Sequence, residues 1–335
     1  MTTIAEHPTL ADVAREAGIS PSTASRALRG DAAVRAATKR RVHEAARRLG
    51  YEPNRLARSL RTRSSSFVGV IVPDIAIGFY ARAVKGAQDV LERAGYQVLV
   101  MNTERQGRRE AEAVRTLLAH RVDGVLLATS GGIEGSDRVP VVFFDNLLPG
   151  FGVGNVARAN RDGMAILVSH LAEHGHERIG FVGAPPVLTS GLERLEGFHA
   201  SVASADLTVR PEYVRLGDEA WSPASGERAM RELLDLDEPP TAIVIASDTL
   251  AFGAIEAIRA RGRRIPDDIA LVSFDDPLFG DLLDPPVTAL ARTERELGEL
   301  AASLLLHALQ TGARAAPAEV RLPVELIVRR SCGCR

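Results

Sequence analysis

The segment Thr9–Gly30 (TLADVAREAGISPSTASRALRG) constrains the fold of this chain more than any other. Apolar residues in its first half recur at the i, i+3, i+4, i+7 spacing of one helix face, and Thr9 stands where an N-cap is expected. Gly18 ends this helix, and Ser20 caps a second helix with Pro21 at its first position. Two short helices joined by a glycine-containing turn form a helix-turn-helix, which places its second helix in the major groove of DNA.

The outward face of the second predicted helix is polar and basic, as a DNA-reading face requires. Arg26 can donate two parallel hydrogen bonds to a guanine edge, Ser22 can read any base, and Pro21 offers an apolar surface to a thymine methyl group. The short hydroxyl side chains suit phosphate oxygens, which position a helix without reading sequence. The predicted DNA contacts of this helix are Pro21, Ser22, Thr23, Ser25, Arg26 and Arg29.

A third helix is expected near residues 36–49, rich in Lys and Arg and ending at Gly50. Beyond it, Asn54 can cap a helix of only two turns, from Arg55 to about Arg61. A helix this short is marginal alone and forms only when it packs against something. The polar linker 61–66 (RTRSSS) follows, and the composition changes abruptly after it.

Charge is divided unevenly along the 335 residues, a length that suggests two or three domains. Residues 1–63 carry 13 basic and 6 acidic side chains, a net charge of +7. The remaining residues carry 28 basic and 37 acidic side chains, a net charge of −9, so that the whole chain sums to −2. A small basic head on an acidic body predicts a polyanionic partner for the head alone.

The body alternates apolar runs of strand length with amphipathic segments of helix length. Buried strands that alternate with crossover helices predict parallel sheets covered on both faces, and two such series predict two similar lobes with a cleft between them. Strands are expected at residues 67–72, 96–102, 123–128, 140–145, 177–183, 241–247 and 268–274, and helices near 81–94, 110–120, 161–173, 194–204, 224–234 and 249–261.

Together, Thr9–Gly30 and the later segment LGYEPNRLARSLRT resemble the head and hinge of the lactose/galactose repressor (LacI/GalR) family of transcriptional regulators. In that family two hinge helices pair at the operator centre and lever a leucine into the minor groove, which unstacks a base step and bends the duplex. The resemblance gives that role to Leu60, with Asn54 and Arg58 as further hinge contacts to DNA. One departure is Arg29, where the family usually has Asn before Gly30, and the arginine can add a contact to a DNA phosphate.

The resemblance covers the whole chain, because the body is similar to the family's periplasmic-binding-protein-like sensor core. It implies an all-α helix-turn-helix head joined to a two-lobed α/β sensor domain with parallel sheets. The expected boundaries are 1–50 for the head, 51–65 for the hinge and linker, 66–157 with 288–317 for the first lobe, and 158–287 with 318–335 for the second.

Ligands of open α/β sheets bind beyond the carboxyl ends of the strands, so polar residues at those ends are candidates for an effector site. Asp145 and Ser247 stand at the carboxyl ends of expected strands, and the resemblance places five further side chains at effector-contact positions. The predicted effector-binding residues are Phe79, Tyr80, Asp145, Arg194, Trp221, Ser247 and Asp275. An Arg and an Asp that fork onto neighbouring hydroxyls, beside a Trp to stack on, suit a sugar-like ligand.

Three departures leave the ligand class open. The family's frequent Asn-Asp pair is Ser247-Asp248 here, and Ala128 stands where sugar responders often have a polar residue. The segment 131–139 is short for the helix usually found there. A nucleoside, a polyol or an unusual glycoside therefore stays open beside a common sugar.

Other chemistry finds little support in the sequence. The adjacent residues Asp275 and Asp276 point apart on a strand end, and no Ser/His/Asp set, P-loop or HExxH motif occurs, so we expect no enzyme activity and no cofactor. The glycines of 150–154 indicate a plain turn, and His174-Gly-His176 a surface segment. The terminal pair Cys332-Gly-Cys334 supplies two thiols, but a structural zinc ion needs partners that the sequence does not indicate, so no metal is expected.

Two other classes compete with the regulator. A solute-binding protein shares the two-lobed body but requires a secretion signal and lacks the head, and a two-lobed enzyme requires a catalytic set. The first eight residues have no basic region followed by an apolar core, no apolar run approaches a membrane span, and two cysteines form no disulfide framework. These features predict a cytoplasmic protein.

The expected mechanism joins head, hinge and cleft. A homodimer formed through the sensor lobes places two recognition helices in successive major grooves, so the operator should be a pseudo-palindrome. The tail RRSCGCR has no leucine heptads that could tether two dimers. Effector binding changes the angle between the lobes and thereby aligns or separates the hinge helices.

Overall fold

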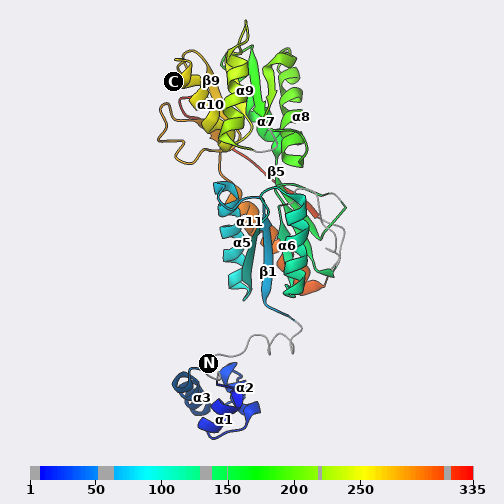
Figure 1. Ribbon diagram of the computed structural model, residues 1–335, viewed down its shortest axis with the longest axis vertical. Coiled ribbons are helices and arrows are strands. Elements are labelled where there is room, and N and C mark those ends of the chain that lie inside the picture. The colour runs from blue at the N-terminus through cyan, green and yellow to red at the C-terminus, as the bar shows by residue number, and fades with distance from the viewer. Residues whose placement is uncertain are drawn as a thin grey trace, which may run out of the picture. The chain divides into compact units, whose positions relative to one another are not determined.

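The computed structural model describes residues 8–51, 64–128, 138–148, 150–217, 221–312 and 318–334. The chain divides into two compact units, Met1–Ser65 and Ser66–Arg335, drawn in dark blue and in cyan to red in Figure 1. No described helix combines the length and the apolar character that a membrane crossing requires.

The first unit is a small three-helix head. Its helices are α1 (Leu10–Glu16), α2 (Pro21–Leu28) and α3 (Ala36–Leu49). Thr9 caps α1 in a reciprocal box, because the Asp12 amide donates to its hydroxyl while its own amide donates to the Asp12 carboxylate. Ser20 caps α2, and α3 ends at Gly50, whose φ of +64° suits a glycine. The structure confirms the three helices and their caps.

The second unit contains two six-stranded sheets. The first has the strand order β11-β5-β4-β3-β1-β2 and the second the order β12-β10-β9-β8-β6-β7. Every pairing is parallel except that of β10 with β12. The predicted two-lobed α/β architecture with parallel sheets is therefore confirmed.

Helices cover both faces of the first sheet, and the core divides accordingly. Its strands are β1 (Phe67–Val72), β2 (Gln97–Asn102), β3 (Gly124–Leu127), β4 (Val141–Phe144), β5 (Gly154–Arg158) and β11 (Ala318–Leu322). Helices α5 (Gly78–Arg93) and α11 (Glu294–Thr311) pack on the face that carries Val70, and α6 (Gly107–Ala119) packs on the face that carries Ile71. Gly298 lets α11 approach α5 closely, since a Cβ there would lie 1.8 Å from the Ala83 carbonyl oxygen.

The second lobe has the same layered plan around one continuous core. Its strands are β6 (Ile179–Gly183), β7 (Val214–Leu216), β8 (Ala242–Ile245), β9 (Ala270–Ser273), β10 (Thr288–Leu290) and β12 (Leu326–Ile327). Its helices are α7 (Asn160–Glu173), α8 (Thr189–Ser204), the short 3-10 helix Pro211–Tyr213, α9 (Pro223–Leu234) and α10 (Asp248–Ala260). Helices α7 and α8 lie on one side of the sheet, and α9 and α10 on the other (Figure 1).

Two of the expected lobe boundaries are wrong. Residues 288–290 were assigned to the first lobe, but they form β10 of the second sheet. Residues 318–322 were assigned to the second lobe, but they form β11, which pairs with β5 of the first sheet. The chain therefore crosses between the sheets after Arg158, after Leu290 and after Leu322. Strands β10 and β11 are too short to form long apolar runs, so the sequence pattern could not assign them to a lobe.

Two helices begin earlier than expected, which changes the setting of three candidate residues. Helix α5 begins at Gly78 rather than at 81, so Phe79 and Tyr80 lie in its first turn instead of in a loop. Helix α8 begins at Thr189 rather than at 194, so Arg194 lies in its second turn. Helix starts of only a few residues are too short to show the apolar periodicity that marks the rest of the helix.

Candidate nucleic-acid interface and interlobe pocket

The outward face of α2 presents the residues predicted to contact DNA. Ala24 and Ala27 are fully buried against α1 and α3, which turns the opposite side of the helix toward solvent. Thr23 and Ser25 are partly exposed, and the other four predicted residues, Pro21, Ser22, Arg26 and Arg29, are exposed. The predicted contact surface therefore exists as one face.

Arg26 is held in place by an ion pair on this face. Its Nε donates to Asp31 Oδ2 at 2.9 Å, and the side chain of Arg26 is 46% exposed. The hydrogen bond from Arg26 and its charge lower the pKa of Asp31. Because Nε carries this contact, the donors of both terminal amino groups of the guanidinium remain for a bidentate contact with guanine.

Two further residues of this face are partly engaged within the head. The Thr23 hydroxyl lies 2.9 Å from that of Ser20, the N-cap of α2. Arg29 Nε donates to the Ser25 carbonyl at 3.1 Å. The remaining predicted DNA contacts, Asn54, Arg58 and Leu60, lie outside the described residues.

Side chains from both lobes meet around one small pocket at the carboxyl ends of the two sheets. The pocket has fifteen lining residues and a volume of about 40 Å³. All seven predicted effector-binding residues line it: Phe79, Tyr80, Asp145, Arg194, Trp221, Ser247 and Asp275. Asn146, Arg158 and Ser190 are among the other eight.

A buried arginine-aspartate network occupies the centre of the pocket. Arg158 Nη1 donates to Asp275 Oδ1 at 2.5 Å, and Arg194 Nη1 lies 3.5 Å from Asp275 Oδ2. Burial opposes the charge of Asp275, but the two guanidinium groups outweigh it and lower the pKa of that carboxyl. Burial lowers the pKa of Arg194 to about 10, against the opposing effect of Asp275. The charges are thus paired, as buried charges must be.

Aromatic rings surround the two guanidinium groups. The Arg194 guanidinium lies 3.9 Å from the centre of the Phe274 ring and 5.6 Å from that of Trp221. The Arg158 guanidinium lies 4.9 Å from both the Phe79 and Phe274 rings. Flat apolar faces beside fixed hydrogen-bonding groups are typical of a site for a small polar molecule with an apolar side.

Asp145 is the first lobe's buried carboxylate in the pocket. It adopts a φ of +66°, and strained backbone of this kind in a residue other than glycine gathers at functional sites. The Tyr80 hydroxyl donates to Asp145 Oδ2 at 3.1 Å, and Asn146 Nδ2 donates to the same oxygen at 3.3 Å. Burial raises the pKa of Asp145 although Arg194 and Arg158 act against it.

Ser247 and Asp248 occupy the N-terminus of α10. The Ser247 hydroxyl accepts a hydrogen bond from the Leu250 amide at 3.2 Å, which makes Ser247 the N-cap and leaves its own proton for another acceptor. Burial and the neighbouring charge of Asp275 raise the pKa of Asp248 to about 6. Asp248 is thus a buried carboxyl that takes up a proton under mildly acidic conditions.

Direct contacts join the lobes beside the pocket. Asn146 Oδ1 of the first lobe accepts hydrogen bonds from the amide and hydroxyl of Ser190 in α8, at 3.2 and 2.8 Å. Glu193, also in α8, receives two bonds from Arg321 of β11, at 2.6 and 2.7 Å. Burial opposes the charge of Glu193, but the bonds from Arg321 outweigh it and lower the pKa.

Sequence reasoning missed Arg158, the partner of Asp275. Arg158 is the last residue of β5, whose sequence GNVAR alternates poorly and was not recognised as a strand. Had β5 been recognised, Arg158 would have stood at a strand end, where pocket residues are expected. Phe274, in contact with both guanidinium groups, was read only as part of a strand.

Both structural units of the chain are similar to domains of known proteins. Residues 9–54 match the family described as bacterial regulatory proteins, lacI family, and residues 168–332 match the periplasmic binding protein-like domain. The chain is 32% identical over 329 residues to the HTH-type transcriptional repressor CytR of Escherichia coli strain K12, with 96% of each chain covered.

Two solved structures with similar folds extend over nearly the whole chain. The lac repressor dimer bound to operator and the anti-inducer ONPF has a TM-score of 0.86 at 29% identity, covering 98% of this chain and 99% of the other. The complex of the transcriptional regulator CelR with cellobiose has a TM-score of 0.73 at 31% identity, covering 97% and 99%. The chain therefore belongs to the LacI family of DNA-binding transcriptional regulators, as its head and hinge motifs predicted.

Proposed function

We propose that this regulator is a repressor whose affinity for its operator is set by a small polyhydroxylated molecule bound between the sensor lobes. The observation that carries the proposal is the buried network of Arg158, Asp275 and Arg194. These three charged side chains come from both lobes and lie at the centre of a pocket that all seven predicted residues line.

The chemistry of the network favours neighbouring hydroxyl groups. A hydroxyl group both donates and accepts, so a diol can accept from Arg194 while it donates to Asp275, and no charge is left unpaired. Trp221 supports this reading, since its ring stands beside the Arg194 guanidinium and offers an apolar face for a sugar ring. The cellobiose complex of the relative CelR supports a sugar as well.

The pocket must rearrange to admit such a ligand. The groups that a ligand would bind already bond to the protein, since Arg158 donates to Asp275 and Arg194 donates to the Ala246 carbonyl oxygen. Entry therefore requires the lobes to separate or the network to change partners. The contacts of Asn146 with Ser190 and of Glu193 with Arg321 would then change as well, which gives the ligand a preferred angle between the lobes.

A change of lobe angle reaches DNA through the hinge at residues 51–65. A coupling of about 1–3 kcal/mol between effector and operator corresponds to a change of about 5- to 150-fold in affinity. The operator is a pseudo-palindrome read by a homodimer, as the structure of the lac repressor dimer on its operator supports. The protein acts in the bacterial cytoplasm, where the DNA lies, and it catalyses no reaction.

A thermal-melt screen of the purified chain against sugars, polyols, nucleosides and their phosphates tests the proposal. A ligand at 100 times its dissociation constant adds about 2.7 kcal/mol, worth roughly 5–10 °C in a domain of this size. A sugar or polyol should raise the melting temperature of the wild-type chain and of the control variant Asp237→Asn, which changes an exposed carboxylate. Asp275→Asn should lose the shift.

Isothermal titration then separates the outcomes. A heat of binding with a pentose, hexose or disaccharide supports the proposed ligand class if the Asp275→Asn variant shows no such heat. Heat with a nucleoside alone, or no heat with any polyhydroxylated compound, would overturn that class and leave the DNA-binding function standing.

A further inference from the structure

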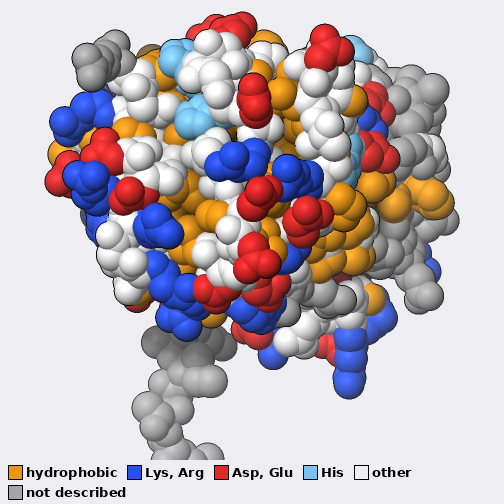
Figure 2. Space-filling model, turned by 90° about the horizontal axis from the view of Figure 1, so that it is seen from above, with side chains coloured by type: hydrophobic (Ala, Val, Ile, Leu, Met, Phe, Trp, Pro, Cys, Tyr) orange, Lys and Arg blue, Asp and Glu red, His pale blue; other side chains and the backbone are white. Residues whose placement is uncertain are grey.

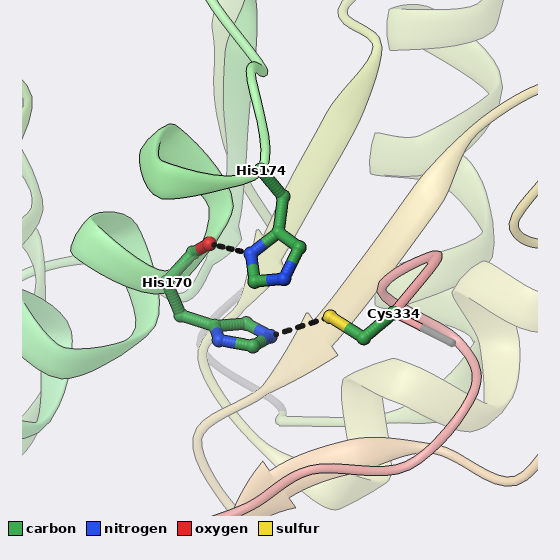
Figure 3. A group of neighbouring side chains, drawn as sticks. All are labelled: His170, His174 and Cys334. Atoms are coloured by element: carbon green, nitrogen blue, oxygen red, sulfur yellow. Dashed lines mark hydrogen bonds between the residues drawn. The ribbon is translucent and has the colours of Figure 1, made fainter.

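A cluster of histidine and cysteine side chains lies in the second lobe, away from the pocket. His170 and His174 stand four residues apart at the end of α7, so both rings lie on one face of the helix. Cys334 comes from the C-terminal segment. One ligand atom from each of these residues lies within 4.8 Å of the other two. Figure 3 shows the two rings and the thiol gathered at this helix end.

The hydrogen bonds of the cluster leave the histidines ready to bind a metal ion. His174 Nδ1 lies 2.6 Å from the His170 carbonyl oxygen. Because a carbonyl oxygen can only accept, His174 carries its proton on Nδ1 and keeps the lone pair on Nε2. Metal-binding histidines are oriented in this way, with one ring nitrogen donating to a carbonyl group.

The spacing of the cluster resembles that of a tetrahedral zinc site. Zinc-nitrogen bonds of about 2.0–2.1 Å and zinc-sulfur bonds of about 2.3 Å place a nitrogen and a sulfur ligand roughly 3.5 Å apart. The distance from His170 Nε2 to Cys334 Sγ is 3.3 Å. This pair needs almost no movement to share an ion.

A second thiol stands beside the first. Cys332 Sγ lies 2.9 Å from Cys334 Sγ, and its side chain is 1% exposed. The Thr288 hydroxyl is 3.1 Å from Cys332 Sγ, so a buried donor stands ready to stabilise a thiolate. Two sulfur ligands of one zinc ion stand about 3.7 Å apart, so the two thiols would separate by less than about 1 Å.

We propose that His170, His174 and Cys334 bind a zinc ion, with Cys332 as the fourth ligand. Two thiolates with two imidazoles select zinc among the common divalent ions, and four protein ligands make a closed, structural site. At the surface, the end of the second lobe seen in Figure 2 carries exposed histidine side chains among interspersed charges of both signs. The His174 side chain is exposed, so an ion can reach the cluster from solvent.

The site joins two segments that are distant in the sequence. Helix α7 directly follows the first crossing between the lobes, and the segment with Cys332 and Cys334 follows the third crossing and β12. Bound zinc would link the C-terminal end of α7 to the segment that carries Cys332 and Cys334, and so stabilise the second lobe. Since the ligands must lose protons, affinity should fall with decreasing pH.

Cobalt and zinc titrations of the full chain, without a histidine tag, test the proposal. The protein is reduced, stripped of metal with a chelator and titrated with each ion. We expect one ion per chain, a sulfur-to-cobalt charge-transfer band, and the intense visible bands of tetrahedral cobalt. Zinc should raise the melting temperature. If the reduced chain binds less than one zinc ion per chain, the proposed site is overturned. The same holds if the two thiols form a disulfide and bind no zinc.

Single substitutions assign the ligands. His174→Ala changes an exposed ring and should leave the fold intact, yet it and Cys334→Ser should weaken zinc binding by at least about tenfold. Both should also lose the rise in melting temperature. The control His307→Ala changes an exposed histidine of α11 in the first lobe and should bind zinc like the wild type. Equal affinity in His174→Ala and wild type would contradict the site.

Cys332→Ser tests the fourth ligand separately. It should halve the charge-transfer intensity of the cobalt protein, because one of two thiolates is lost. Unchanged intensity would show that Cys332 is not a ligand.

Discussion

The head and the sensor each contain an arginine paired with an aspartate, and the two pairs differ in their surroundings. In the head, Arg26 and Asp31 are 2.9 Å apart with side chains 46% and 36% exposed. In the sensor, Arg158 and Asp275 are 2.5 Å apart with side chains 3% and 8% exposed. Water can replace either partner in the head, but not in the sensor.

This difference indicates what each pair can do. A surface ion pair contributes little to stability, so Arg26 can exchange Asp31 for a guanine edge at little cost. A buried pair that loses one partner leaves an uncompensated charge. Under the proposed function, a ligand of the sensor pocket would have to offer hydrogen bonds to Arg158, Arg194 and Asp275. The buried pair would then select ligands by their chemistry, and the exposed pair would hold a DNA-reading side chain reversibly.

The largest expected effect is that of Asp275→Ala on stability. The substitution leaves Arg158 and Arg194 buried without their shared carboxylate, which should lower the free energy of unfolding by about 3–5 kcal/mol. Denaturant unfolding followed through Trp221, the single tryptophan, measures it in the sensor. A loss no larger than that of the exposed control Asp237→Asn would remove the distinction between the pairs.

Asp248→Asn should instead stabilise the sensor, in a pH-dependent manner. The pKa of Asp248 is raised from 3.8 to about 6, so the folded state binds its proton more tightly than the unfolded state. The wild type therefore loses stability as the pH rises from about 4 to about 6, and the variant does not. Above pH 6 the variant should be more stable by about 2–3 kcal/mol. Parallel stability curves for the two proteins would contradict a raised pKa at the buried Asp248.

Arg26→Ala should affect the reading of DNA while the head stays folded. Loss of a bidentate guanine contact should cost about 1–3 kcal/mol and relax one base position in each half-site. Arg29→Ala, the matched control, should weaken binding to all sequences alike, because a phosphate contact carries no sequence information. Competition binding with single-base operator variants distinguishes the two, and unchanged specificity in Arg26→Ala would mean that α2 is placed wrongly on DNA.

Asp31→Asn should have the smallest effect. Its carboxylate is exposed, and the hydrogen bond from Arg26 persists to the amide oxygen. We expect a melting temperature near that of the wild type and an operator affinity equal to it or slightly higher, since a negative charge near the phosphates is removed. A marked loss of operator affinity would show that Asp31 positions Arg26 more strictly than an exposed pair should.

The sequence predicted those features that local chemistry determines. The head followed from caps at Thr9 and Ser20 and from Gly18 and Gly50, each of which acts within a few residues. The long apolar runs of the central strands were equally readable. The seven pocket residues were found because they follow strand ends or fit the family pattern, and their role as ligand contacts stays a prediction.

The features that were missed depend on tertiary pairing. Strands β10 and β11 have three and five residues, and each is assigned to a sheet only by its hydrogen-bonded neighbours. Strand β10 pairs with β9 and β12, and β11 pairs with β5, more than a hundred positions earlier along the chain. Arg158 was missed as a pocket residue because its strand, β5, was not recognised from the sequence for the same reason. The sequence drew attention to His174 and His176 across a glycine, whereas the structure turns His176 toward Thr241 and brings His170 and His174 to Cys334.

The effect of a pocket ligand on operator affinity tests the central claim most directly. Operator binding of the full chain is measured by fluorescence anisotropy with and without the compound found in the melt screen, in the wild type, in Asp275→Asn and in the milder variant Ser247→Ala. We predict a shift of about 5- to 150-fold in the wild type, a smaller shift in Ser247→Ala and none in Asp275→Asn. A ligand that binds without changing operator affinity, or a shift that persists undiminished in Asp275→Asn, would contradict control through the buried arginine-aspartate network.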